Sequence, residues 1–132
     1  MNKSPELSIC ILVYNQPDDI QRLLESLASQ VDDRVEIVIR DDSTNDDTKN
    51  IVQSFSKIPQ LKYYKGLREG IDKTILFLTE VADGDFIWWM GDDDISSDAL
   101  NKILDLIKKY PSLGFIWANY NIVNTDIVAI DI

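Results

Sequence analysis

The sequence predicts an α/β protein, a mostly parallel sheet with helices on both of its faces. The apolar run 7–14, rich in β-branched residues, is typical of a strand buried on both sides, and 35–40 is predicted as a second strand. Segments with apolar residues at helical spacing, beginning with 17–28, alternate with these strands. Strands that alternate with helices through short connections favour parallel pairing.

The first half of the chain contains two strand–helix units. Pro17 is suited to the first turn of a helix, whose apolar face is then formed by Ile20, Leu23, Leu24, Leu27 and Ala28. A second strand is predicted at 35–40, and the polar cluster 41–48 after it can cap a second helix. The apolar residues of that helix are Ile51, Val52 and Phe55.

The second half continues the alternation. A short strand is expected at 61–64, and the helix after it carries one apolar face formed by Ile71, Ile75, Leu78 and Ala82. A turn at 83–84 precedes an aromatic strand at 85–90. Ser96 or Ser97 is expected to cap a last helix, with an apolar face formed by Leu100, Ile103, Leu104 and Ile107. A fifth strand is predicted at 113–118.

Composition argues against several classes of function. A net charge of −10 argues against nucleic acid as a partner and against docking of this segment on anionic lipid. The chain has no histidine, which excludes Ser-His-Asp catalysis, Cys-His catalysis and histidine-bound zinc. The single cysteine, Cys10, lies in an apolar run and is expected to be buried. No apolar run approaches the roughly 20 residues of a membrane span and no signal peptide is recognisable, so we expect one cytoplasmic domain over 1–132.

Polar segments follow four of the predicted strands. Right-handed crossovers place the carboxyl ends of parallel strands along one sheet edge, where such sheets bind ligands. The segments at that edge are Tyr14-Asn15, Asp41-Asp42, 65–70 and 91–94. Grouped carboxylates repel each other unless water or a cation neutralises them, and Mg²⁺ or Mn²⁺ is suited to carboxylate and phosphate oxygens. The pattern predicts a divalent metal and a diphosphate at this edge.

Plainer interpretations exist for some residues near that edge. Helix caps and solvated turns account equally well for three of the acids, Asp46, Asp47 and Asp98. Lys65 and Arg68 can approach a diphosphate, but lone loop cations are equally typical of an ordinary surface. The three tryptophans are expected in the core: Trp88, Trp89 and Trp117.

Three ordered segments resemble the family 2 glycosyltransferases. They are 8–17 (SICILVYNQP), 36–48 (EIVIRDDSTNDDT) and 82–95 (ADGDFIWWMGDDDI), and the last matches the DxD region. The resemblance implies a GT-A fold, which is Rossmann-like, and inverting transfer of a sugar from a nucleoside diphosphate to an acceptor hydroxyl. It also implies dependence on Mn²⁺ or Mg²⁺. Residues 70–72 and 88–94 most resemble the subgroup that adds deoxy- or dideoxyhexoses to bacterial surface polysaccharide.

The resemblance assigns roles to matching residues. Tyr14 and Asp42, with Asp41 beside it, would border the nucleobase, and Asp92 would approach the ribose. Asn15 and Arg68 complete the expected donor-binding residues. Asp93 would coordinate the metal that bridges the diphosphate, and Asp94 would be an alternative or supporting ligand.

The chain departs from the family pattern in two places. Leu12-Val13 stands where the family usually has Pro-Thr, and Glu69 stands where it usually has Asn. The base is therefore left open, with UDP as the default donor nucleotide. The family's catalytic base lies well beyond the DxD region, and neither Asp126 nor Asp131 suits that role. We therefore expect an incomplete catalytic domain that lacks the base.

Partners and alternatives follow from the same comparison. The acceptor would be a saccharide or a lipid-linked sugar, so the intact enzyme can be peripheral at the inner face of the membrane. A non-catalytic nucleotide-binding or interaction module is the main alternative. A nucleotidyltransferase is less favoured because no glycine- and basic-rich loop follows the first strand. A signalling receiver is disfavoured because Tyr14-Asn15 stands where receivers carry an acid pair.

Overall fold

A computed structural model of the protein describes residues 3–91 and 95–116. Within these residues, strands and helices alternate along the chain: β1 (Leu7–Val13), α1 (Pro17–Ala28), β2 (Val35–Asp41), α2 (Asp47–Ser54), β3 (Leu61–Lys65), α3 (Ile71–Val81), β4 (Phe86–Met90) and α4 (Ala99–Lys109). Each predicted strand and helix between residues 7 and 109 is present, with ends that differ by one or two residues.

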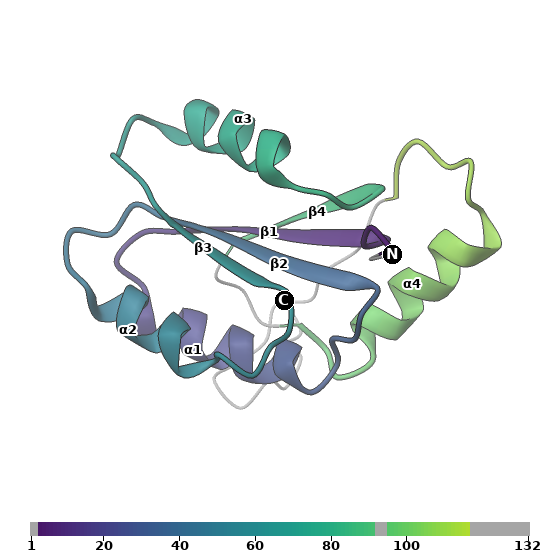
Figure 1. Ribbon diagram of the computed structural model, residues 1–132, viewed down its shortest axis with the longest axis horizontal. Helices are drawn as coiled ribbons and strands as arrows, with labels where there is room; N and C mark the ends of the chain where they lie inside the picture. The colour runs from purple at the N-terminus through teal and green to yellow at the C-terminus, as the bar shows by residue number, and fades with distance from the viewer. Residues whose placement is uncertain (1–2, 92–94, 117–132) are drawn as a thin grey trace, which may run out of the picture.

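The described strands form one parallel sheet in the order β3-β2-β1-β4. Ile9 of β1 pairs with Ile37 of β2 on one side and with Trp88 of β4 on the other. Helix α3 covers one face of the sheet, and α1 and α2 lie against the other (Figure 1). The predicted parallel sheet with helices on both faces is confirmed.

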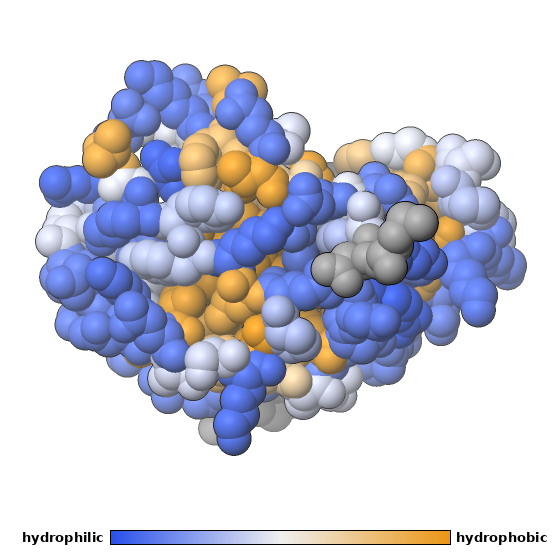
Figure 2. Space-filling model, viewed as in Figure 1, coloured by the Kyte–Doolittle hydropathy of each residue, from blue (hydrophilic) through white to orange (hydrophobic). Residues whose placement is uncertain are grey.

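Side-chain alternation along the strands builds two separate cores. The larger core joins the sheet to α1, α2 and α4, and the buried side chains of β2 in it are Val35, Ile37 and Ile39. The smaller core lies under α3, where Cys10 and Val38 meet Leu78. Figure 2 shows the apolar side chains gathered between the helical layers, with polar side chains over the outer faces of the helices.

The amphipathic helix α1 forms as the sequence predicts. Pro17 lies in its first turn, where a missing N–H costs no intrahelical hydrogen bond. Its buried residues are Ile20, Leu23, Leu24 and Leu27, each fully inaccessible to solvent. Cys10 is likewise fully buried, as expected of a small hydrophobe.

Helix α3 matches the predicted inward face only in part: Leu78 and Ala82 pack in the smaller core, but Ile71 and Ile75 do not. Ile71 is 70% exposed and Ile75 is 38% exposed, whereas Thr74 and Leu78 are buried. Phe77 and Val81 pack beside Leu78, so the inward stripe is 74, 77, 78 and 81. Residues three and four apart share a helix face, and a threonine in that stripe hides it from a purely apolar pattern.

Three smaller predictions are wrong. Trp89 is 41% exposed and is not a core residue, because β4 is an edge strand of the described sheet. Residues 113–116 are not in a strand, and the rest of the predicted fifth strand, with Trp117, lies outside the described residues. The N-cap of α4 is Asp98, without a side-chain capping bond, and not Ser96 or Ser97.

Candidate functional site

A pocket of about 320 Å³ opens at the carboxyl ends of β1 and β2, beside the first turn of α3. Its lining residues are Leu12, Val13, Tyr14, Asp42, Arg68, Gly70, Ile71 and Thr74. The walls are mainly apolar, and Asp42 is the one acid among these lining residues. This is the sheet edge at which ligands bind in parallel α/β folds, as the sequence predicts.

The two acids that end β2 lie on opposite sides of the sheet. Asp41 is the last residue of the strand and faces the larger core, where its carboxylate meets Tyr63. Asp42 follows on the α3 side, and its carboxylate meets Thr74. Successive side chains of a strand alternate between faces, so only Asp42 reaches the pocket.

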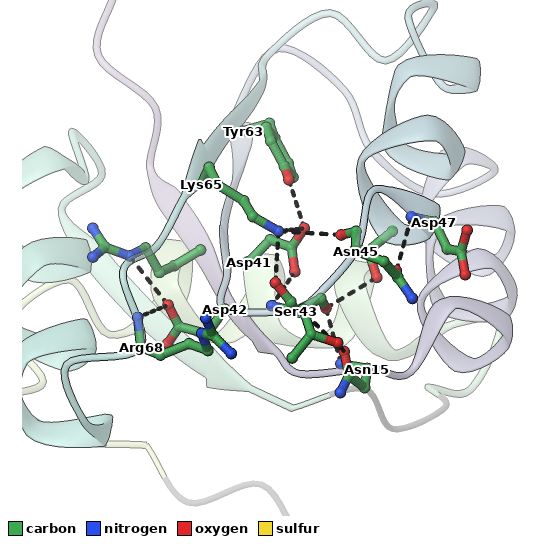
Figure 3. A network of polar contacts seen from close by, with 12 residues as sticks. Asn15, Asp41, Asp42, Ser43, Asn45, Asp47, Tyr63, Lys65 and Arg68 are labelled. Carbon is green, nitrogen blue, oxygen red and sulfur yellow. Dashed lines mark hydrogen bonds and ion pairs between the residues drawn. The ribbon is translucent and has the colours of Figure 1, made fainter.

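Asp41 is buried within a set of hydrogen-bond donors (Figure 3). The Ser43 backbone N–H donates to Oδ1 at 2.9 Å, and the Tyr63 hydroxyl donates to Oδ2 at 2.5 Å. Lys65 Nζ lies 3.6 Å from Oδ2. Burial alone would raise the pKa of Asp41, but the bonds from Ser43 and Tyr63 and the charge of Lys65 outweigh it and hold that pKa below its usual value. The arrangement favours a fixed, ionised carboxylate that supports the strand end.

Asp42 is partly exposed and lies at the pocket wall. Thr74 Oγ1 is 3.1 Å from Asp42 Oδ2 and 3.1 Å from the Gly70 carbonyl oxygen, so its single hydrogen serves one acceptor at a time. The Arg68 backbone N–H donates to Asp42 Oδ1 at 3.4 Å (Figure 3). A Cβ at Gly66 would lie 1.7 Å from that same oxygen, so any larger residue there requires the Asp42 carboxylate to move.

Asn15 joins the loop after β1 to the loop after β2. Its backbone N–H donates to Ser43 Oγ at 2.8 Å, and its side-chain oxygen accepts from the Thr44 backbone N–H at 2.9 Å. Asn15 has a φ of 51°, a left-handed conformation that asparagine tolerates better than most residues. Tyr14 is thereby left 56% exposed at the pocket mouth.

Comparison with known proteins identifies the family. The profile described as glycosyl transferase family 2 matches residues 8–128. The chain belongs to this family.

Curated relatives of the family 2 chain carry out several kinds of sugar transfer. A GalNAc(5)-diNAcBac-PP-undecaprenol beta-1,3-glucosyltransferase of Campylobacter jejuni is 28% identical over 76% of this chain and 34% of its own length. A chondroitin synthase of Escherichia coli is 30% identical over 92% of this chain and 18% of its own length. The chain thus spans about a third or less of the length of these relatives.

Solved structures share the fold. S. aureus TarS 1-349 in complex with UDP superposes with a TM-score of 0.73 at 28% identity, over 80% of this chain and 33% of the other. The same TarS segment has been solved with UDP-GlcNAc, with a TM-score of 0.72 at 27% identity, 80% coverage of this chain and 32% of the other. These likenesses bear out the GT-A fold expected from the sequence.

The structure gathers some of the predicted donor-binding residues and separates others. Tyr14, Asp42 and Arg68 line one pocket, and Asn15 stabilises its rim. Asp41 does not line the pocket. The remaining predicted residues, Asp92, Asp93 and Asp94, lie outside the described residues.

Thr74 is the pocket residue that sequence reasoning missed. It is buried, lines the pocket and bonds the carboxylate that the sequence singled out. A threonine inside an apolar helical stripe, four residues after Gly70, was the available signal. Lys65, in contrast, is exposed and does not line the pocket: its Nζ donates to the carbonyl oxygens of Ser43 at 2.8 Å and Asn45 at 3.2 Å.

Metal ligands and membrane spans were both sought in the described part of the chain. Over 3–91 and 95–116, no three acidic or cysteine side chains are grouped so that they could hold a metal ion. Among the same residues, no helix is long and apolar enough to cross a bilayer.

Proposed function

We propose that this chain is the donor-binding part of a glycosyltransferase that moves a sugar from a nucleoside diphosphate to an acceptor hydroxyl. The single observation that supports it best is the pocket beside Asp42, at the sheet edge where the family 2 fold presents its ligands. UDP and UDP-GlcNAc complexes of a structural neighbour add support for a nucleotide-sugar donor.

The pocket suits a planar base that presents an N–H group. A carboxylate accepts hydrogen bonds and donates none, and Asp42 is the acid among the lining residues. Uracil, like thymine and guanine, offers a ring N–H to such an acceptor, whereas the ring nitrogen of cytosine is bare and only its amino group can donate. The apolar side chains of Leu12, Val13 and Ile71 are suited to the faces of the ring. Because the structural neighbour TarS has been solved with UDP, we propose UDP as the donor nucleotide, with Tyr14 and Arg68 at the rim.

We propose that the divalent cation, Mn²⁺ or Mg²⁺, is held by Asp93 and Asp94, with Asp92 at the ribose. These acids follow β4 along the chain, and the described residues supply no competing group of ligands. Carboxylates together with phosphate oxygens are the ligands such ions prefer. When bound, the ion would stabilise negative charge on the leaving diphosphate.

For the acceptor and the displacement step, we propose only the type of group that takes part. A sugar hydroxyl of a saccharide or lipid-linked acceptor would attack the donor in a single displacement, after a base takes its proton. No residue of this chain is assigned as that base. The names of two relatives, one with an undecaprenol-linked acceptor and one a chondroitin synthase, support an acceptor of this kind. We place the reaction at the cytoplasmic face of a membrane as part of the proposal.

Calorimetric titration tests the proposal. UDP, GDP, CDP and dTDP are each added to the protein with Mn²⁺, with Mg²⁺ or with excess chelator. We expect UDP to bind most tightly, and more tightly with Mn²⁺ or Mg²⁺ than with chelator. Absence of binding by every nucleotide, in a sample shown to unfold cooperatively in urea, would contradict a donor site in this chain.

A further inference from the structure

Arg40 is a buried cation directly behind the pocket. It is 7% exposed, lies one residue before the end of β2, and is not among the pocket-lining residues. Its guanidinium lies over the Phe77 ring, 4.3 Å from the centroid. A buried charge is costly unless opposite charges and hydrogen bonds compensate it.

The acids that compensate the charge of Arg40 lie beside the pocket. Arg40 Nε lies 3.8 Å from Asp42 Oδ1, and a terminal guanidinium nitrogen lies 4.0 Å from Glu69. Arg40 and Asp42 are two positions apart, so strand alternation places both on the α3 side. Glu69 belongs to the loop 66–70, and Asp42 accepts a hydrogen bond from the Arg68 backbone N–H of that loop. The same loop supplies Arg68 and Gly70 to the pocket.

One hydrogen-bond donor of Arg40 is left unused. Nε is inaccessible to solvent and has no hydrogen-bond partner among the described residues. Its nearest charged neighbour is Asp42 Oδ1, just beyond hydrogen-bond distance. A small rotation of the Asp42 side chain would close that gap. Buried polar atoms in native proteins are rarely unpaired, so this atom calls for an explanation.

We propose that Arg40 is a positioning residue for the nucleotide pocket, which acts on the ligand through Asp42; the inference rests on the proposed nucleotide site. Its charge holds the Asp42 carboxylate at the pocket wall, and its free Nε–H is the donor that Asp42 takes when a base occupies the pocket. Through Glu69 the same guanidinium restrains the loop that carries Arg68. Arg40 itself does not touch the nucleotide.

A double-mutant cycle on UDP binding separates this role from simple packing. Dissociation constants are measured for the unaltered protein, Arg40→Met, Asp42→Asn and the double variant, with ligand-observed NMR for weak binders. Urea unfolding of each variant identifies the folded population. Because each tenfold change in affinity corresponds to about 1.4 kcal/mol, coupling through one charged contact is measurable.

We expect Arg40→Met to weaken UDP binding by about tenfold, the size of a lost charge-assisted hydrogen bond. In the Asp42→Asn background, the same change should weaken binding by less than about twofold, because the residue through which Arg40 acts is already altered. Arg40→Lys should recover part of the affinity, since it keeps the charge without the planar fork. If Arg40→Met does not fold, the cycle is run with Arg40→Lys.

Lys62→Met is the matched control. Lys62 is also a cation facing α3, but it pairs with Glu36 and Asp83 at the far end of the sheet. The substitution Lys62→Met should lower the urea midpoint of unfolding and leave the affinity for UDP unchanged. Arg40 variants that bind UDP like the unaltered protein would overturn the inference and leave the proposed function standing. Equal losses from Arg40→Met in both backgrounds would also overturn it, whereas an unaltered protein that binds no nucleotide overturns both.

Discussion

The Tyr63 hydroxyl donates to Asp41 Oδ2 at 2.5 Å, on the face of the sheet opposite the pocket. This bond fixes the end of β2 to its neighbour β3. The adjacent acid, Asp42, is thereby presented on the other face. Two neighbouring aspartates therefore have separable effects, one on the stability of the fold and the other on binding.

Replacing Asp41 should lower stability in a pH-dependent way. Asp41→Asn removes an ionised acceptor from Tyr63 and Lys65, and we expect a loss of about 1–3 kcal/mol in the free energy of unfolding at pH 7. The pKa of Asp41 is lowered in the folded state, so its stabilisation is present above the unfolded pKa of about 4 and is lost as pH falls through the folded value. Urea unfolding from pH 7 down to pH 3 checks this. A difference between the two proteins that stays constant over that range would contradict it.

Removing the Thr74 hydroxyl should weaken nucleotide binding. Thr74→Val keeps the shape but leaves Asp42 Oδ2 without its donor, and we expect UDP affinity to fall about three- to tenfold. Thr79→Val is the control, because Thr79 is an exposed residue of the same helix whose hydroxyl bonds only its own turn. Calorimetry on both variants measures the effect. Equal affinities for the two variants would argue against a role for Thr74 at the ligand.

Adding a methyl group at Gly66 should displace Asp42. The new Cβ would meet Asp42 Oδ1 at 1.7 Å and Arg40 Nε at 2.6 Å, and overpacking of this kind costs about 1–3 kcal/mol. We expect Gly66→Ala to lower both the urea midpoint and the affinity for UDP. Gly114→Ala is the matched control, since nothing lies within 4 Å of its Cβ position. Full UDP affinity in Gly66→Ala would show that the carboxylate can move without harm to the site.

A substitution at the end of the sheet farthest from the pocket should lower stability without changing nucleotide binding. Ser8 Oγ donates to Glu36 Oε1 at 2.5 Å and accepts from the Gly84 backbone N–H at 2.8 Å. Ser8→Ala leaves both buried partners short of a bond, so the free energy of unfolding should fall by about 1–3 kcal/mol. Urea unfolding and UDP titration of the same sample test the separation. Weaker UDP binding in the folded variant would mean that the two ends of β1 are coupled.

Removing the expected metal ligand should abolish the metal effect on binding. Asp93→Ala is predicted to bind UDP equally with Mn²⁺ or with chelator, because a carboxylate is the ligand that holds such an ion. Asp98→Ala is the control: this acid is exposed, pairs with Lys102 and precedes α4. Titrations with and without Mn²⁺ measure the difference. Metal-dependent binding that survives in Asp93→Ala would assign the ion to other residues.

The sequence predicts the alternation of strands and helices because each segment carries a pattern of its own. Burial on both faces makes β1 a mainly apolar run, β-branched residues mark β2, and the spacing of Leu23, Leu24 and Leu27 gives α1 its helical period. The exposed face of α3 could not be predicted from its own residues. Ile71 lines the pocket and Thr74 turns inward to bond Asp42, a contact with another element that the residues of the helix do not reveal.

The sequence predicted the location of the pocket better than it predicted which residues contact one another there. The edge follows from topology, so Asp42 and Tyr14 could be placed there from sequence order. Which acid of the pair faces the pocket depends on the exact residue at which β2 ends. Arg40 carried a readable signal, a positive charge directly after the apolar residues 37–39, but its partner Phe77 comes from α3 and appears only in three dimensions.

Because β1 lies between β2 and β4, the order of synthesis determines how long one edge of β1 stays unpaired and able to aggregate. During synthesis, β1 and β2 can pair early, but β4 begins only at Phe86. Until then the other edge of β1 presents unpaired backbone groups on an almost wholly apolar strand. Such an edge can pair with another nascent chain. Ribosomes that pause while residues 66–85 emerge should therefore produce the most aggregate.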